Sequence, residues 1–124
     1  MEPVLLKYRN NDHDYLVYDI NKNHTFLDSH AVRAICSYNC GLGSTGIVAG
    51  PYEGADGKMT MKFFTPDGSE KPANREGLHT GLCYLLDAGY LSGNGRDNYE
   101  ARPVGKVFLS DNLLREIFSP AARA

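Results

Sequence analysis

The chain has 124 residues, of which 42% are hydrophobic and 23% charged, and its formal net charge is -2. This composition predicts one globular domain with a real core and argues against a disordered chain. The balanced charge gives no reason to expect nucleic acid or an anionic membrane as a partner. No apolar run approaches the ~20 residues of a membrane span, and the N-terminus lacks the regions of a signal peptide, so a cytoplasmic protein is expected.

Two strands are expected near the N-terminus, at residues 4–8 and 15–20, because both are rich in Val, Leu, Ile and Tyr. The link between them, residues 9–14, is polar throughout and predicts a loop that carries Asn11 and His13.

A helix is expected next, capped by Asp28 or Ser29 and ending near Gly41. The segment GLGSTG at 41–46 shares glycines with a dinucleotide-binding fingerprint, but it follows a predicted helix and precedes a predicted strand at 47–49. The fingerprint requires the opposite order, so tight backbone packing is favoured over phosphate binding.

The three cysteines, Cys36, Cys40 and Cys83, make an odd number, which argues against a disulfide framework. Cys36 and Cys40 can share one face of a helix, but no matching Cys/His pair follows at a usual metal-ligand spacing. We therefore expect buried thiols, no metal and no other cofactor.

The second half begins with a clean alternation at residues 58–63, which predicts a strand. A turn at 66–69 follows, and leucines at helical spacing from Leu78 onward predict a second helix that ends at Gly89. A last strand is expected at 104–109, and a short final helix capped by Asp111.

The stretch TPDGSEKPANREGLH, residues 65–79, leads into the second helix. Asn74 is a favoured N-cap residue, and a cap is the preferred interpretation. Alternatively, the free N–H groups of this helix start bind a carboxylate or phosphate, which Arg75 would strengthen and Glu76 would oppose. His79 lies one turn further along.

Five segments carry a family resemblance: DYLVYD at 14–19, NCGLGSTGI at 39–47, GP at 50–51, MKFFTPDGSE at 61–70 and YLLDAGY at 84–90. In this order and near this spacing they resemble the N-terminal lobe of diaminopimelate epimerase. The resemblance implies an α+β fold: one lobe with a mixed or antiparallel sheet wrapped around a central helix. This lobe is expected to span residues 1–118, with 119–124 as a frayed tail.

Members of that family use no cofactor. Two cysteines, one in each lobe, remove the α-proton of the substrate and return it on the opposite face. The resemblance places the family's Cys-Gly-Asn-Gly run on residues 74–77, so Asn74 stands where the proton-transferring cysteine would be. Arg75 and Glu76 replace substrate-binding residues, as do His13 and Thr65 elsewhere in the cleft.

The scaffold positions thus match the family while the cleft positions do not, which favours repurposing over loss. The first hypothesis is a cofactor-independent isomerase or cyclase acting on a small metabolite, although the sequence leaves open whether the protein is an enzyme. Acid–base roles would then fall to His13, Glu76 and His79, and binding roles to Asn11, Thr65, Asn74 and Arg75.

Two other functions remain open. The chain is a non-catalytic protein that binds a small molecule or a partner, or it is one half of a split amino-acid epimerase. A single lobe would leave its cleft surface exposed, so we also expect a homodimer with a shared pocket near the start of the second helix.

Overall fold

The computed structural model describes residues 4–23, 27–38, 44–93, 96 and 100–108. In chain order its elements are β1 (Val4–Asn10), β2 (His13–Asp19), α1 (Ile20–Asn23), α2 (Ser29–Tyr38), β3 (Ser44–Glu53), β4 (Met59–Phe64), β5 (Glu70–Lys71), α3 (Arg75–Asp87) and β6 (Arg102–Phe108).

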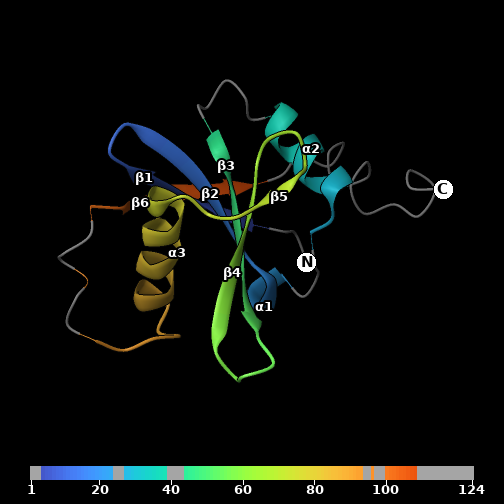
Figure 1. Cartoon of the computed structure of the whole chain (residues 1–124). Coiled ribbons are helices and arrows are strands. Elements are labelled where there is room, and N and C mark those ends of the chain that lie inside the picture. The colour runs from blue at the N-terminus through green and yellow to red at the C-terminus, as the bar shows by residue number, and fades with distance from the viewer. Residues whose placement is uncertain (1–3, 24–26, 39–43, 94–95, 97–99, 109–124) are drawn as a thin grey trace.

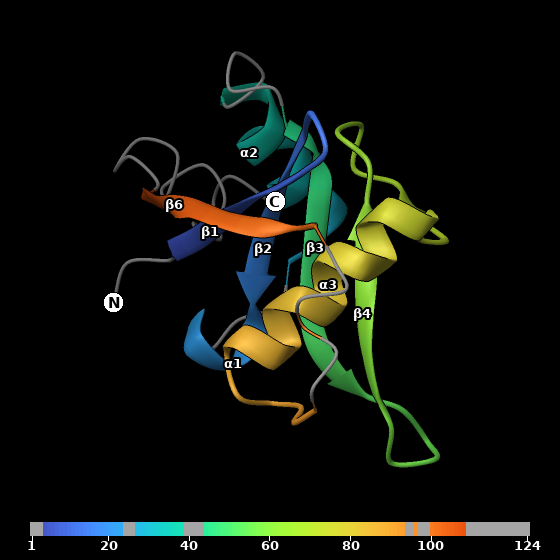
Figure 2. The ribbon, with the colours of Figure 1, turned by 90° about the vertical axis from the view of Figure 1, so that its left-hand side faces the viewer.

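The described strands form one mixed sheet in the order β5-β4-β3-β2-β1-β6. All neighbouring strands are antiparallel except β2 and β3, which run parallel. Helix α3 contacts strands β1 to β4 and lies on the opposite side of the sheet from α2 (Figure 1). In Figure 2 it crosses in front of β3 and β4. The expected fold, an α+β lobe with a mixed sheet around a helix, is confirmed.

Each face of the sheet has its own core. Strand β2 is buried over six consecutive residues, and because alternate side chains point to opposite faces it serves both cores. Leu16 and Tyr18 pack with the α2 residues, whereas Tyr15 and Val17 pack with Tyr84 of α3. A central strand covered on both sides reads as an almost continuous apolar run, which is why this segment was predicted as a strand.

The predicted loop at residues 9–14 is wrong. Strands β1 and β2 continue until Asn10 pairs with His13, so only residues 11 and 12 form the turn. Asn11 has a positive φ of 54°, a conformation that Asn tolerates in tight turns. The polar strand ends are stabilised across the hairpin, where Arg9 Nε lies 2.8 Å from an oxygen of Asp14. The hydrogen bond from Arg9 lowers the pKa of Asp14, against the effect of burial.

Other boundaries differ by a few residues. Ile20 begins the short helix α1 instead of ending β2, because the Asp19 carboxylate accepts the backbone N–H groups of Asn21 and Lys22. Strand β3 extends beyond the predicted 47–49 on both sides, and the two-residue strand β5 was not predicted. Strand β4 starts at Met59, whose side chain is 39% exposed at the open end of the sheet.

The predicted helix boundaries are largely confirmed. Helix α2 begins at Ser29, with Asp28 accepting the N–H of Ala31 at 2.8 Å. Helix α3 ends before Gly89, whose φ of 84° permits the N–H of Tyr90 to bond the carbonyl of Leu85. The last strand, expected at 104–109, is β6 and spans Arg102–Phe108. Gly41, Cys40, the helix after Asp111 and the tail at 119–124 lie outside the described residues.

None of the helices in the described part of the chain has the length and apolar character needed to cross a bilayer.

The turn before α3 depends on Gly68, which has a φ of 91° and packs closely on α2. A Cβ at this position would lie 2.6 Å from the carbonyl oxygen of Ser29. Gly57 also has a positive φ, 78°, but a Cβ there would meet nothing within 4 Å.

These two glycines give a matched pair of substitutions. We expect Gly57→Ala to lower the free energy of unfolding by about 1–2 kcal/mol through backbone strain alone. Gly68→Ala should cost about 1–3 kcal/mol more, because the overlap with Ser29 must also be relieved. Urea denaturation of both variants measures the difference, and equal losses would show that the turn does not press on α2.

Candidate functional site

The first turn of α3 is closed by Asn74. Its backbone is extended, with φ -71° and ψ 173°, and its Oδ1 accepts the N–H of Gly77 at 2.6 Å. This is an N-cap, so the favoured interpretation of Asn74 is confirmed. Glu76 lies in the same turn, where a negative charge interacts favourably with the helix dipole.

The Glu76 carboxylate is bound by three side chains from the β1–β2 hairpin. Its Oε1 lies 2.7 Å from His13 Nδ1 and accepts the Tyr15 hydroxyl at 2.6 Å. Its Oε2 accepts the Asn11 amide at 3.2 Å. Residues some sixty positions apart in the chain are thereby held together at the helix start.

The backbone of the same turn is also held by the hairpin. Asn10 is buried, and its Nδ2 donates to the Glu76 carbonyl at 3.2 Å and to the Thr80 hydroxyl at 3.3 Å. Sequence reasoning found Asn11, His13 and Glu76 but missed Asn10 and Tyr15. A signal was available, since a tyrosine two residues after His13 in a strand projects from the same face of the sheet.

These contacts keep Glu76 ionised. Burial by itself would raise the pKa of this carboxyl, but the hydrogen bonds from Tyr15, Asn11 and His13 lower it below the ordinary value. Burial and the bond to Glu76 raise the pKa of Tyr15, so the phenol stays protonated as a donor.

The tautomer of His13 follows from this pairing. An ionised carboxylate can only accept, so the Nδ1 that faces Glu76 carries a proton. In the neutral ring Nε2 is then the free base, and it has no hydrogen-bond partner among the described residues. The side chain of His13 is 60% exposed, so a molecule from solvent can reach Nε2.

The other predicted site residues are not joined to this pair by any of these contacts. Thr65 Oγ1 lies 2.5 Å from an oxygen of Asp67, within its own turn, and this bond is the first cause of an Asp67 pKa of about 2. Arg75 is exposed as the first residue of α3, and His79 is half-buried in its second turn.

The described cysteines are poor candidates for acid–base work. Cys36 and Cys83 are 3% and 0% exposed. Burial raises the pKa of the Cys36 thiol to about 11 and also raises that of Cys83. Both were expected as buried thiols, which is confirmed, while Cys40 lies outside the described residues. Within those residues, no three His, Cys, Asp or Glu side chains are grouped as metal ligands.

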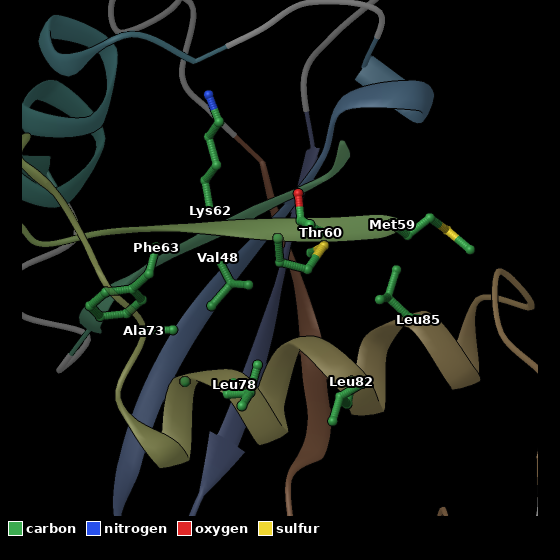
Figure 3. Close-up of a pocket in the computed structure, with 11 residues that line it drawn as sticks. Val48, Met59, Thr60, Lys62, Phe63, Ala73, Leu78, Leu82 and Leu85 are labelled. Atoms are coloured by element: carbon green, nitrogen blue, oxygen red, sulfur yellow. The ribbon is translucent and has the colours of Figure 1, made fainter. Parts of the chain in front are cut away.

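An apolar groove of about 210 Å³ lies between α3 and β4, and β4 is separated by β3 from β2, which carries His13. Figure 3 shows Lys62 and Thr60 of β4 pointing away from α3, so the side chains that face the helix are apolar. The residues that line the groove are Val48, Met59, Thr60, Met61, Lys62, Phe63, Ala73, Gly77, Leu78, Leu82 and Leu85.

The fold and site together define a single α+β lobe with a polar cluster at the start of its central helix. No protein-family model matches the chain. The chain is similar to diaminopimelate epimerase 2 of Nostoc sp. (strain PCC 7120 / SAG 25.82 / UTEX 2576), with 35% identity over 85 residues. The match covers 68% of this chain but 30% of that protein. The resemblance to diaminopimelate epimerase is thus confirmed, and it is that of a partial, single-lobe relative.

The hairpin contacts predict a pH-dependent effect of Glu76→Gln. We expect this variant to lose about 1–3 kcal/mol of unfolding free energy at pH 7, because it loses charge-assisted bonds. The pKa of Glu76 is lowered by folding, so its contribution is present above the ordinary value of 4.5 and is lost as the pH falls through the lower folded-state value. The free energies of unfolding of the unmodified protein and of Glu76→Gln should therefore become equal at acid pH.

Chemical denaturation at a series of pH values measures this convergence. Glu70→Gln is the matched control, because Glu70 is 55% exposed and lies 3.9 Å from Lys62, and such a surface pair contributes at most about 1 kcal/mol. A Glu76→Gln deficit that stays constant down to pH 3 would contradict the assigned role of the carboxylate.

Proposed function

We propose that this chain is a repurposed relative of diaminopimelate epimerase that acts as a cofactor-independent isomerase or cyclase on a small metabolite. The observation that carries this proposal is the His13–Glu76 pair, 2.7 Å apart at the start of α3. A half-buried carboxylate that orients an exposed imidazole is an arrangement suited to general-base catalysis.

In this mechanism Nε2 of His13 removes a proton from the substrate, and Glu76 stabilises the imidazolium that forms. Tyr15 and Asn11 hold the carboxylate in place, so the ring keeps one orientation while it gains and loses the proton. Return of the proton to a different substrate atom completes an isomerisation or a ring closure without net redox change. A positioned base of this kind contributes about 10²–10⁴-fold to the rate.

Cysteine-based epimerisation finds no support in the described residues. Asn74 occupies the position that the resemblance gives to the proton-transferring cysteine, and its amide serves as a helix cap. Cys36 and Cys83 are buried thiols. The chain also spans 30% of the relative's length, so the activity of that whole protein does not transfer to it.

A second candidate is a non-catalytic protein that binds a small molecule. It is favoured by the hydrogen bonds of the helix start, where the Glu76 carboxylate and the Asn74 amide already have partners within the chain. Polar groups that are satisfied internally stabilise a scaffold without any reaction.

Turnover distinguishes these functions. Mixtures of candidate metabolites would be incubated with the protein in D₂O and followed by NMR for new products or deuterium incorporation. We expect one substrate to react, and His13→Ala and Glu76→Gln to slow the reaction at least about 100-fold. Asp12→Ala is the control, because Asp12 lies on the same exposed hairpin turn outside the Glu76 contacts.

Full turnover by His13→Ala would refute the assignment of His13 as the catalytic base. A ligand that binds but is unchanged after long incubation would favour the second candidate. Deuterium exchange at the α-carbon of diaminopimelate would instead support the hypothesis that the chain is one half of a split amino-acid epimerase. No such exchange is expected.

We also propose that two copies of the chain pair, as expected for a single lobe. Large apolar side chains are exposed on strand β6, where Val104 and Phe108 are 51% and 64% exposed. Such surfaces on small proteins commonly mark contacts between subunits. Size-exclusion chromatography with light scattering at micromolar concentration should give twice the mass of 13.7 kDa, and a monomer would refute the pairing.

A further inference from the structure

The groove and the His13–Glu76 pair meet at the first turn of α3. Gly77 lines the groove and donates its N–H to Asn74, while Glu76, the preceding residue, binds His13. Behind them the rings of Tyr15 and Phe63 are in contact, with centroids 6.1 Å apart. A single molecule lying across Asn74 would therefore touch both places.

The pair adjoins the near end of the groove, at Gly77, which directly follows Glu76 in α3. Phe63, on the β4 wall of the groove, is level in the sheet with Val17, four residues along β2 from His13. At ~3.3 Å per residue, Phe63 lies roughly 13 Å from His13 along the strand direction.

The side chains of the groove favour apolar ligands. Its facing side chains carry no charge, and two of them, Met59 and Met61, are flexible thioethers that adapt to apolar ligands of different shape. Gly81 of α3 lets the helix approach these side chains closely, because a Cβ there would lie only 3.3 Å from Met61 Cγ and Val48 Cγ1. The exposed side chains of Leu78 and Met59, at 54% and 39%, leave the groove open to solvent.

Resting on the proposed function, we infer that the groove holds the apolar part of the substrate. The substrate class is then an amphipathic small molecule, with a short alkyl chain or one ring in the groove and a polar end that reaches across Asn74 to His13. This assignment explains why the side chains that face α3 across the groove are apolar while the helix start beside it is polar.

Straight-chain carboxylates provide a direct probe. Butanoate, hexanoate and octanoate would be titrated into ¹⁵N-labelled protein and followed by NMR, with the His13 ring as a reporter for the polar end. We expect the Kd to fall about threefold to fourfold for each added methylene, the increment for burying one such group in an apolar site. Backbone shifts should concentrate at Gly77, Leu78 and Leu82.

Two serine substitutions localise the effect. Leu78 lines the groove and Val104 does not, yet their exposures are similar, at 54% and 51%. Leu78→Ser should weaken octanoate binding by about tenfold, the loss expected for roughly two methylenes of contact. Val104→Ser should leave the Kd unchanged. Because both side chains are exposed, both variants should stay folded, which the NMR spectra verify.

The inference is overturned if the Kd does not depend on chain length, if no carboxylate binds, or if both variants weaken binding equally. A groove already filled by a second copy of the chain would give the second of these results, and light scattering would identify it. The groove and the proposed reaction fail separately, because binding needs no turnover. Chain-length dependence that survives in His13→Ala would support the groove even if the protein proved to be inactive.

Discussion

Helix α3 is fixed to the sheet by tyrosine–carboxylate hydrogen bonds at both of its ends. At the start, Tyr15 of β2 donates to Glu76 at 2.6 Å, and at the end Tyr8 of β1 donates to Asp87 at 2.6 Å. Tyr84 of α3 donates in the opposite direction, to the buried Asp19 of β2. Bonds to an ionised acceptor are about twice as strong as neutral ones, and these lie in surroundings that exclude much of the water.

This attachment of α3 to the sheet determines where the His13–Glu76 pair lies. Because the helix start is held against the β1–β2 hairpin, His13 meets Glu76 there and presents its other nitrogen to solvent. The groove lies between the same helix and β4. Figure 3 shows the apolar groove between α3 and β4, and the polar pair lies at the start of the same helix.

The relation to diaminopimelate epimerase separates scaffold from function. Fold does not imply function, and here the residues that shape the lobe are those of the resemblance while the residues at its helix start are different. Asn74 illustrates the distinction, since an N-cap side chain preserves the helix start without supplying an acid or a base. A thiolate at that position would exchange protons; an amide only holds the backbone.

The sequence by itself determined the elements that follow from local chemistry. Asn74, Asp28 and Gly89 marked helix ends because caps act on backbone groups within a few residues, and the apolar run of β2 marked a strand. It also brought Glu76, His13 and Asn11 forward as candidates through the resemblance.

Only the tertiary structure decided what these residues contact. The polarity of residues 9–14 predicted a loop, because the pairing of Arg9 with Asp14 depends on two strands meeting. The carboxylate of Glu76 meets Tyr15 and His13 only after a hairpin more than sixty residues away has packed against it, and no local pattern encodes that distance. The groove is likewise a property of the space between α3 and β4, which exists only once the helix has packed on the sheet.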